Sequence, residues 1–257
     1  MKKVIYLVLI LFIQCKNKER INKTDYNIVT KQTENIEVKT KKNINYNFEI
    51  VKVDSIIFKK NQLKFQIEKR KINKITDINL IIKKTKKWAT IKCDLSSESI
   101  DQKLFYLEKI SLENGEVIYC NQNGECSLVA YYPDENIILS ECGHNSDDSY
   151  NLVTGKNTSQ VGNPEYMLES TNKKFRLNGY FPGQECSNYF IQKNINGEYL
   201  KIFEINEVYP FKNVPENFCT MDNLFWTNDY TLNFTIRNYK NKDAGILEYY
   251  QLKIKEL

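Results

Sequence analysis

The chain has 257 residues, enough for one β domain or two small ones. Its net charge of +5 is divided unevenly, because residues 1–114 carry 25 Lys and Arg against 13 Asp and Glu, whereas residues 115–257 carry 12 against 19. The sequence has one histidine. It contains no phosphate-binding glycine loop, nucleophile elbow or dinucleotide fingerprint, which excludes the common nucleotide-binding and serine-hydrolase motifs.

The first element along the chain is an apolar run from Val4 to Ile13, preceded by the positive charges of Lys2 and Lys3. A membrane-spanning helix needs roughly 20 apolar residues, about twice the length of this run. A charged start, a short apolar run and a cleavage site are the parts of a secretory signal peptide. The sequence therefore predicts export.

The run ends in Phe12-Ile13-Gln14-Cys15, which resembles the lipobox of bacterial lipoproteins, although a small residue is usual where Gln14 stands. The resemblance implies a signal peptide over residues 1–14. It also implies that the new N-terminal residue, Cys15, carries a lipid that anchors the protein to the bacterial membrane, on its periplasmic or surface-facing side. An ordinary signal peptide cut elsewhere, or an uncleaved apolar N-terminus, is the alternative.

Residues 15–45 are predicted to form a lipidated N-terminus and a flexible tether. Residues 16–45 carry eight Lys and Arg against four Asp and Glu and show no sustained apolar period. Near an anionic lipid surface each lysine contributes up to about 1 kcal/mol of attraction. The tether therefore has the charge to stay close to the membrane.

From residue 46 onward, apolar residues recur in short runs bounded by polar clusters. β-branched and aromatic residues dominate these runs, and we find no sustained i, i+3, i+4, i+7 pattern of the kind that a helix would need. The pattern predicts an all-β domain over residues 46–257. The first four predicted strands are Phe48–Ile57, Leu63–Ile67, Ile78–Ile82 and Trp88–Cys93.

A basic segment, Lys83-Lys84-Thr85-Lys86-Lys87, lies between the last two of these runs and is followed by Trp88. In an intracellular protein such a segment would suggest nucleic acid, but export excludes that partner. We interpret it as a solvated turn between strands. Contact with acidic polysaccharide or lipid phosphate is the alternative.

The character of the chain changes near residue 113. All nine glycines lie at or after Gly115 and all five prolines at or after Pro133, so tight turns are expected mainly in the second part. The clearest hairpin signals are two Asn-Gly pairs, which favour the positive φ of tight turns. Asn114-Gly115 is expected to join Leu104–Leu112 to Val117–Cys120, and Asn196-Gly197 to join Tyr189–Gln192 to Tyr199–Ile205.

Export makes disulfides plausible, and removal of Cys15 leaves an even number of cysteines. Cys120 and Cys126 flank a third Asn-Gly pair, and a hairpin there places them opposite each other, with Ile118 opposite Leu128. We predict a Cys120–Cys126 bridge on this basis. Three pairings stay open for the other four, with buried free thiols as the alternative. The six candidates are Cys93, Cys120, Cys126, Cys142, Cys186 and Cys219.

From Leu104 onward the chain has a loose internal repeat. Three segments consist of a polar turn that leads into a strand: Tyr132–Leu139, Ser170–Leu177 and Trp226–Leu232. Three others look like turns between outer strands: Lys109–Glu116, Tyr150–Lys156 and Ile191–Glu198.

These repeats resemble the strand-joining turns of β-propeller blades over residues 85–257. Successive leading turns are 38 and 56 residues apart, near the 40 to 50 residues of a four-stranded blade. The resemblance implies about four blade-like units. The predicted fold is thus a propeller-like domain or an irregular assembly of antiparallel sheets.

The sequence offers few groups for catalysis or metal binding. His144 lies in a polar loop after Cys142, and we interpret it as a turn histidine. One Cys-Gly-His spacing is a weak zinc signal. The oxygen-rich stretch Asn145–Asp148 lacks the ligand spacing of a calcium loop. We predict no metal, no cofactor and no catalytic residue.

The function expected from these observations is an exported, lipid-anchored protein whose β domain binds or assembles with an envelope protein or glycan without catalysis. The alternative is an envelope glycan hydrolase, which would use two acidic residues about 5 to 9 Å apart in one cleft.

Overall fold

The computed structural model describes residues 46–65, 71–94, 104–120, 125–184, 186–205, 221–238 and 245–257. Residues 44–257 belong to one compact unit. The predicted signal peptide, Cys15 and the tether lie outside the described residues.

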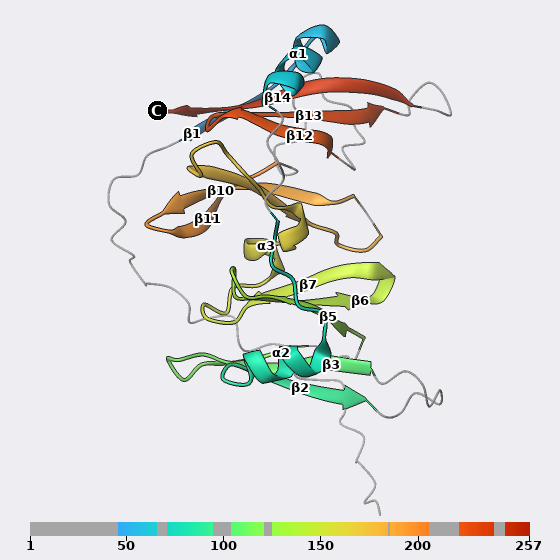
Figure 1. Ribbon diagram of the computed structural model, residues 1–257, viewed down its shortest axis with the longest axis vertical. Coiled ribbons are helices and arrows are strands. Elements are labelled where there is room, and N and C mark those ends of the chain that lie inside the picture. The colour runs from blue at the N-terminus through green and yellow to red at the C-terminus, as the bar shows by residue number, and fades with distance from the viewer. Residues whose placement is uncertain are drawn as a thin grey trace, which may run out of the picture. The chain divides into compact units, whose positions relative to one another are not determined.

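Four antiparallel sheets make up this unit, which confirms the all-β prediction, and they do not close into a propeller ring (Figure 1). The first contains β2 (Ala89–Asp94), β3 (Leu104–Ser111) and β4 (Val117–Tyr119), and the second β5 (Ser127–Tyr132), β6 (Ile137–Cys142) and β7 (Ser146–Asn151). The third contains β8 (Leu168–Glu169), β9 (Phe175–Tyr180), β10 (Asn188–Ile195) and β11 (Glu198–Glu204). The fourth contains β1 (Tyr46–Lys52), β12 (Met221–Asn228), β13 (Thr231–Asn238) and β14 (Ile246–Glu256).

The fourth sheet joins the two ends of the described chain. β1 pairs antiparallel with β14, from Tyr46 opposite Glu256 to Lys52 opposite Tyr250. The other three sheets are built from strands that follow one another along the chain. The domain therefore begins and ends in the same sheet.

The turn predictions are largely confirmed. β3 and β4 pair around Asn114-Gly115, and β10 and β11 pair around Asn196-Gly197, where both residues have positive φ. The three predicted polar leading turns each join two consecutive strands of one sheet: β5 to β6, β8 to β9 and β12 to β13. The change in composition near residue 113 falls inside the β3–β4 turn, so it does not separate two sheets.

The prediction of a strand over Ile78–Ile82 was wrong, because these residues begin helix α2 (Ile78–Thr85). The side chain of Asp77 accepts a hydrogen bond from the backbone N–H of Leu80, which caps the helix. Ile81 and Thr85 are buried one turn apart on one face. This face packs into the core of the first and second sheets.

The expected strands Phe48–Ile57 and Leu63–Ile67 were also wrong in part. β1 ends at Lys52, and helix α1 (Ser55–Phe65) follows. The Asp54 carboxylate accepts a hydrogen bond from the N–H of Ile56, 2.7 Å away, which starts the helix. Residues 66 and 67 lie outside the described part of the chain.

Residues 71–77 run beside the third and second sheets to α2 (Figure 1). Ile75 forms two backbone hydrogen bonds with Tyr131 of β5. Ile72 packs against the apolar cluster that contains Val161 and Met167. This connection is therefore attached to the sheets that it crosses.

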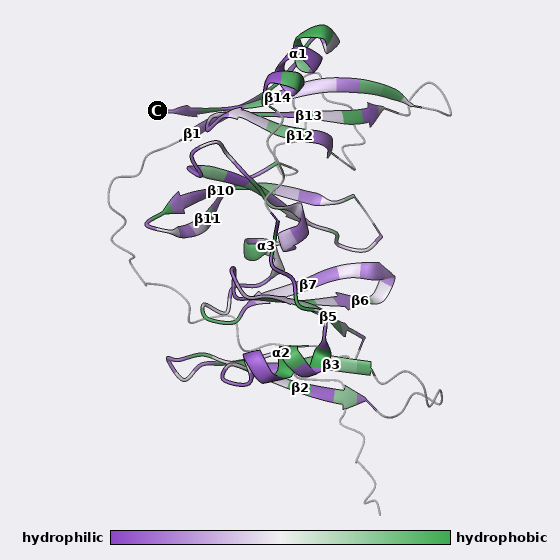
Figure 2. Cartoon of the chain, in the orientation of Figure 1, coloured by the Kyte–Doolittle hydropathy of each residue, from purple (hydrophilic) through white to green (hydrophobic). Residues whose placement is uncertain are grey.

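Apolar clusters hold successive sheets together, and hydrophobic residues occur both in the strands and in helices α1 and α2 (Figure 2). The largest cluster lies between the third and fourth sheets and includes the fully buried Trp226. The indole N–H of Trp226 donates to the carbonyl oxygen of Leu168, 3.0 Å away in the neighbouring sheet. Trp226 is thus fully buried while its indole N–H keeps a hydrogen-bond partner.

Asp229 forms a polar contact between the same two sheets. It lies in the β12–β13 turn, and its Oδ1 accepts hydrogen bonds from the Ser170 hydroxyl and the Asn172 backbone N–H, each 2.7 Å long. Its Oδ2 accepts a third from the Asn172 amide. Two of the predicted repeat turns are therefore bonded to each other through one carboxylate.

We expect Asp229→Ala to lower the free energy of unfolding by roughly 2 to 3 kcal/mol, because a hydrogen bond to a charged group is worth about 1.5–3 kcal/mol and the buried Ser170 hydroxyl would lose its acceptor. Urea denaturation measures this change. Asp222→Ala removes an exposed carboxylate from β12 and serves as the control, with an expected change below about 0.5 kcal/mol. Equal effects of the two substitutions would contradict the role of Asp229.

The Asp229 carboxylate also makes the stability of the domain depend on pH. Burial alone raises the pKa of Asp229, but the hydrogen bonds from Asn172 and Ser170 outweigh this and hold the pKa below its ordinary value. Because the folded pKa is lowered, its stabilisation is present above the unfolded pKa of about 3.9 and is lost as the pH falls through the folded value. The stability difference between the native protein and Asp229→Asn is expected to shrink over this acidic range.

Candidate functional site

A polar cleft of about 400 Å³ lies between the second and third sheets, and we call it the Arg176 cleft. The β5–β6 turn, the segment after β7, α3 (Thr158–Val161), strands β9 and β10, and the β10–β11 turn contribute to it. Its lining residues are Asp134, Glu135, Asn136, Ile137, Asn151, Thr154, Lys156, Val161, Arg176, Gln192, Asn196, Gly197, Glu198 and Tyr199.

Arg176 is the central residue of this cleft. It is 4% exposed, and three neighbours fix its guanidinium group. Its Nε donates to Oε1 of Gln192 at 2.6 Å, and its Nη1 donates to Oε2 of Glu135 at 2.8 Å. The aromatic ring of Tyr199 lies against the guanidinium plane, 4.0 Å from ring centroid to Cζ. Among the described residues, no hydrogen-bond partner is seen for its Nη2.

A buried amide network supports Arg176 from behind. Oε1 of Gln192 also accepts from Nδ2 of Asn178, and Nε2 of Gln192 donates to the carbonyl oxygen of Gln160. Asn178 donates to the carbonyl oxygen of Val161 at the end of α3. These bonds satisfy side chains that would be costly to bury without partners, and they fix the orientation of the guanidinium.

Polar groups from the two facing sheets meet at the rim. Lys156, which follows β7, forms an ion pair with Glu198 of β11 at 2.5 Å. The side chain of Asn151 donates to the backbone carbonyl of Glu135, which ties the end of β7 to the β5–β6 turn. The hydroxyl of Tyr199 donates to the carbonyl oxygen of Lys173 at 3.0 Å. Hydrogen bonds and an ion pair therefore hold the lining residues in place without a ligand.

The cleft combines a guanidinium group, three carboxylates, one ammonium group and several side-chain amides. Its charges are nearly balanced, so the lining suits a ligand with many neutral hydroxyl or amide groups better than a strongly charged one. The volume falls within the range of pockets that hold small ligands. We see the strongest candidate for a binding site in this cleft.

A second polar cluster lies around Asp147, where β7 meets the third sheet. Its carboxylate accepts hydrogen bonds from Asn163 Nδ2 at 2.9 Å and from the Phe181 N–H at 2.7 Å. Burial raises the pKa of Asp147 despite these bonds. The carboxylate joins two sheets through these bonds, which indicates a structural role.

The prediction of a turn histidine is confirmed. His144 is exposed, has positive φ and lies in the 3-10 turn η1 (Gly143–Asn145). Its Nε2 is 2.8 Å from the side-chain nitrogen of Gln184. It does not line the Arg176 cleft.

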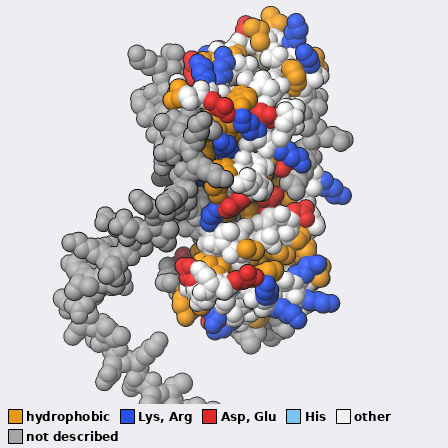
Figure 3. All heavy atoms as spheres, turned by 90° about the vertical axis from the view of Figure 1, so that its left-hand side faces the viewer, with side chains coloured by type: hydrophobic (Ala, Val, Ile, Leu, Met, Phe, Trp, Pro, Cys, Tyr) orange, Lys and Arg blue, Asp and Glu red, His pale blue; other side chains and the backbone are white. Residues whose placement is uncertain are grey.

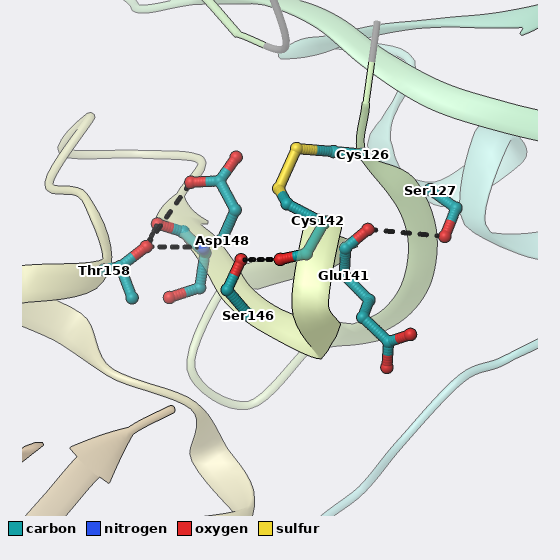
Figure 4. Close-up of a disulfide and its surroundings, with 9 residues drawn as sticks. Cys126, Ser127, Glu141, Cys142, Ser146, Asp148 and Thr158 are labelled. Carbon is teal, nitrogen blue, oxygen red and sulfur yellow. Dashed lines mark hydrogen bonds between the residues drawn. A yellow bond between two sulfur atoms is a disulfide. The ribbon is translucent and has the colours of Figure 1, made fainter. Parts of the chain in front are cut away.

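The Cys126–Cys142 disulfide lies beside Asp148 (Figure 4). The two sulfurs and a carboxylate oxygen of Asp148 lie within 4.8 Å of one another. Sulfurs joined in a disulfide are not thiolate ligands, so this form does not provide a zinc site. Burial raises the pKa of Asp148, while hydrogen bonds from Thr158 and Tyr150 favour its charged form.

The predicted Cys120–Cys126 bridge was wrong. β4 pairs with β3, with Ile118 opposite Ile110, instead of forming a hairpin with β5. Cys126 pairs instead with Cys142, because β5 and β6 are neighbours and Ser127 lies opposite Glu141. The Asn123-Gly124 pair lies outside the described residues.

The other cysteines differ in state. Cys120 is a buried free thiol, and burial raises its pKa to about 12. Cys93 is a half-buried free thiol. Cys186 is disulfide-bonded, and Cys219 lies outside the described residues.

The basic segment Lys83–Lys87 forms the last turn of α2 and the following turn into β2, instead of a turn between strands. Thr85 within it is buried, and its hydroxyl donates to the carbonyl oxygen of Ile81. Lys87 forms an exposed ion pair with Glu113 and lies over the ring of Trp88. The segment is therefore partly structural.

Among the described residues, no helix is both long enough and apolar enough to cross a membrane. Comparisons of the chain with family models, with curated proteins and with solved structures find no match.

Sequence reasoning missed Arg176 and the residues around it. Three turns that line the cleft were predicted, namely those at Pro133–Asn136, Gly155–Lys156 and Asn196-Gly197. The sequence did not indicate that these three turns lie next to one another in the folded domain. An available signal was the arginine itself, because Arg176 lies in β9 between the apolar residues Phe175 and Leu177, at a position where a charged side chain requires partners.

We expect Cys126→Ser/Cys142→Ser to lower the free energy of unfolding by about 3 kcal/mol, the value of the chain-entropy model for a loop of about 15 residues. The two cysteines are 16 residues apart. Chemical denaturation under non-reducing conditions measures the change. Cys93→Ser, at a half-buried free thiol, is the control and should have a much smaller effect. A double variant as stable as the native protein would contradict the structural role of the bridge.

Proposed function

We propose that this protein is an exported, lipid-anchored binding protein of the bacterial cell envelope, and that the Arg176 cleft binds a segment of an envelope glycan without catalysis. The charged and apolar order of the N-terminus and the lipobox-like Phe12–Cys15 support the export and the anchor. The cleft supports the binding role.

One observation carries the choice of ligand site. Arg176 is a buried cation with fixed orientation, and part of its guanidinium group has no hydrogen-bond partner among the described residues while it borders a cleft. A guanidinium held by Glu135 and Gln192 is preorganised, so a ligand that bonds to its remaining edge does not have to order it. Sugar hydroxyls are acceptors that fit this edge.

The composition of the rim favours a glycan over a purely anionic ligand. Asn136 and Asn196 provide both donors and acceptors, which match the mixed donor and acceptor character of hydroxyl groups. Asp134 adds an exposed carboxylate.

A glycan hydrolase is the competing function, because three carboxylates line the cleft. Two of them are bonded to cations, Glu135 to Arg176 and Glu198 to Lys156. Retaining and inverting glycosidases require a carboxylic acid that donates a proton and a second carboxylate near it. The observed ion pairs suit binding better than this acid–base pair.

We expect Arg176→Lys to weaken binding of soluble peptidoglycan fragments or envelope polysaccharide by about tenfold or more, because a lost hydrogen bond to a charged group costs about 1.5–3 kcal/mol. Lysine keeps the charge but not the planar donor edge. Isothermal titration calorimetry measures the affinity. Near-ultraviolet circular dichroism confirms that the variant is folded.

Arg237→Lys is the matched control, because Arg237 is exposed at the end of β13 in the fourth sheet. The affinity of the Arg237→Lys variant for the glycan should equal that of the native protein. Binding that Arg176→Lys leaves unchanged would exclude the cleft as the ligand site. Saturable cleavage of the glycan by the pure protein would contradict a noncatalytic role.

The anchor is tested separately by the intact mass of protein extracted from membranes. We expect a chain that begins at Cys15 and carries acyl groups, whereas Cys15→Ser should carry none. Cys93→Ser changes a free thiol within the β domain and should retain the acyl groups. A native protein without acyl groups would refute lipidation and leave the cleft experiment unaffected.

A further inference from the structure

Helix α1 packs on the fourth sheet through one fully buried residue and exposes its opposite face. Phe58 is 1% exposed, and its ring packs 5.1 Å from that of Phe225 and 5.0 Å from that of Tyr249. No other α1 residue is buried. The helix is therefore attached along one narrow face.

The opposite face of α1 is both apolar and basic. Ile56, Ile57 and Leu63 are 76%, 54% and 83% exposed. Lys60 lies between Ile56 and Leu63 at the i+4 and i+7 spacing of one helical face. Lys59 and Lys64 are also exposed, and the helix contains no acidic residue. Three large apolar side chains thus lie in water among three lysines.

The figures show the same combination. Hydrophobic and hydrophilic residues alternate along α1 (Figure 2), and orange and blue side chains adjoin each other at the end of the domain where α1 lies (Figure 3). Exposed apolar side chains that cluster in this way mark an interaction site more often than isolated ones do.

The charge on this face indicates its partner. A helix with lysines beside exposed apolar side chains fits the boundary of an anionic bilayer, where apolar groups enter the headgroup region and ammonium groups contact lipid phosphates. A second copy of this face would bring like charges together, because each copy presents Lys59, Lys60 and Lys64. Charge complementarity therefore favours anionic lipid over self-association.

The position of α1 in the chain agrees with this partner. α1 begins nine residues after Tyr46, where the β domain starts, and Cys15 lies 31 residues before Tyr46. An anchor at Cys15 would hold the helix at high effective concentration next to the bilayer, so weak intrinsic affinity is sufficient.

We propose that the exposed face of α1 lies on the anionic membrane surface, with Ile56, Ile57 and Leu63 in the headgroup region. This inference rests on the proposed export and anchoring for its biological setting. It predicts that the fourth sheet faces the membrane and that the third sheet separates the fourth sheet from the Arg176 cleft.

The test uses the full protein, extracted from membranes and reconstituted in vesicles, with Leu63→Trp as a local probe. Leu63 is 83% exposed, so the substitution does not disturb packing. The emission of Trp88 and Trp226 is subtracted with the unsubstituted protein. With phosphatidylglycerol vesicles we expect a blue-shifted probe emission and quenching by brominated lipid. Phosphatidylcholine vesicles should give neither, and 1 M salt should reduce both, because the Debye length then falls to about 3 Å.

Charge reversal provides the controls. Lys59→Glu/Lys60→Glu/Lys64→Glu in the probe protein should abolish the shift, whereas Lys83→Glu/Lys84→Glu on α2 should leave it unchanged. A probe that stays water-exposed in anionic vesicles while the mass shows acyl groups on Cys15 would overturn the inference and leave the anchor intact. A shift that appears without vesicles and grows with protein concentration would overturn it in favour of self-association.

Discussion

The pairing of β1 with β14 is the constraint on which the rest of the fold depends. It joins residues about 200 positions apart in the chain, from Tyr46 opposite Glu256 to Lys52 opposite Tyr250. Loop closure over this distance costs entropy that local contacts do not recover. The apolar side chains of β1 offset this cost by packing against the third sheet. There the ring of Phe48 stacks on the ring of Phe203 in β11, with 3.9 Å between the ring centroids.

This pairing also dictates the path of the chain. Because β1 belongs to the fourth sheet, the chain has to travel past the other sheets before it forms the first one. Residues 71–77 lie on this path beside the third and second sheets, and the backbone hydrogen bonds between Ile75 and Tyr131 attach them to the second sheet. The sheets are then added in chain order until β12–β14 return to β1. One long-range strand pair thus determines where each later element lies.

Much of this fold could be predicted from local sequence chemistry, and the misses have physical causes. Asn-Gly pairs specify a backbone conformation, so the hairpin at Asn196-Gly197 was found. The disulfide depended on a single-residue bulge at Val129, which shifts the β5–β6 register and brings Cys126 opposite Cys142. Nothing in the local pattern marks that bulge. The α2 helix was missed although Asp77 offered a capping signal, because its apolar residues equally suit a short strand.

The cleft escaped prediction for a different reason, and that reason bears on its use. Its residues come from turns, from helix α3 and from strands of the second and third sheets, which are adjacent only after the sheets have packed. Evolution could have filled the space beside Arg176 with apolar side chains, as between the third and fourth sheets. Instead a buried cation is held by Glu135, Gln192 and the ring of Tyr199. Such a network is costly to bury and rarely adds stability over an apolar core. The bond to Glu135 joins the third sheet to the second, so that part of the network serves the fold. The guanidinium edge that these bonds leave over at the cleft is the part that supports the proposed recognition of a ligand.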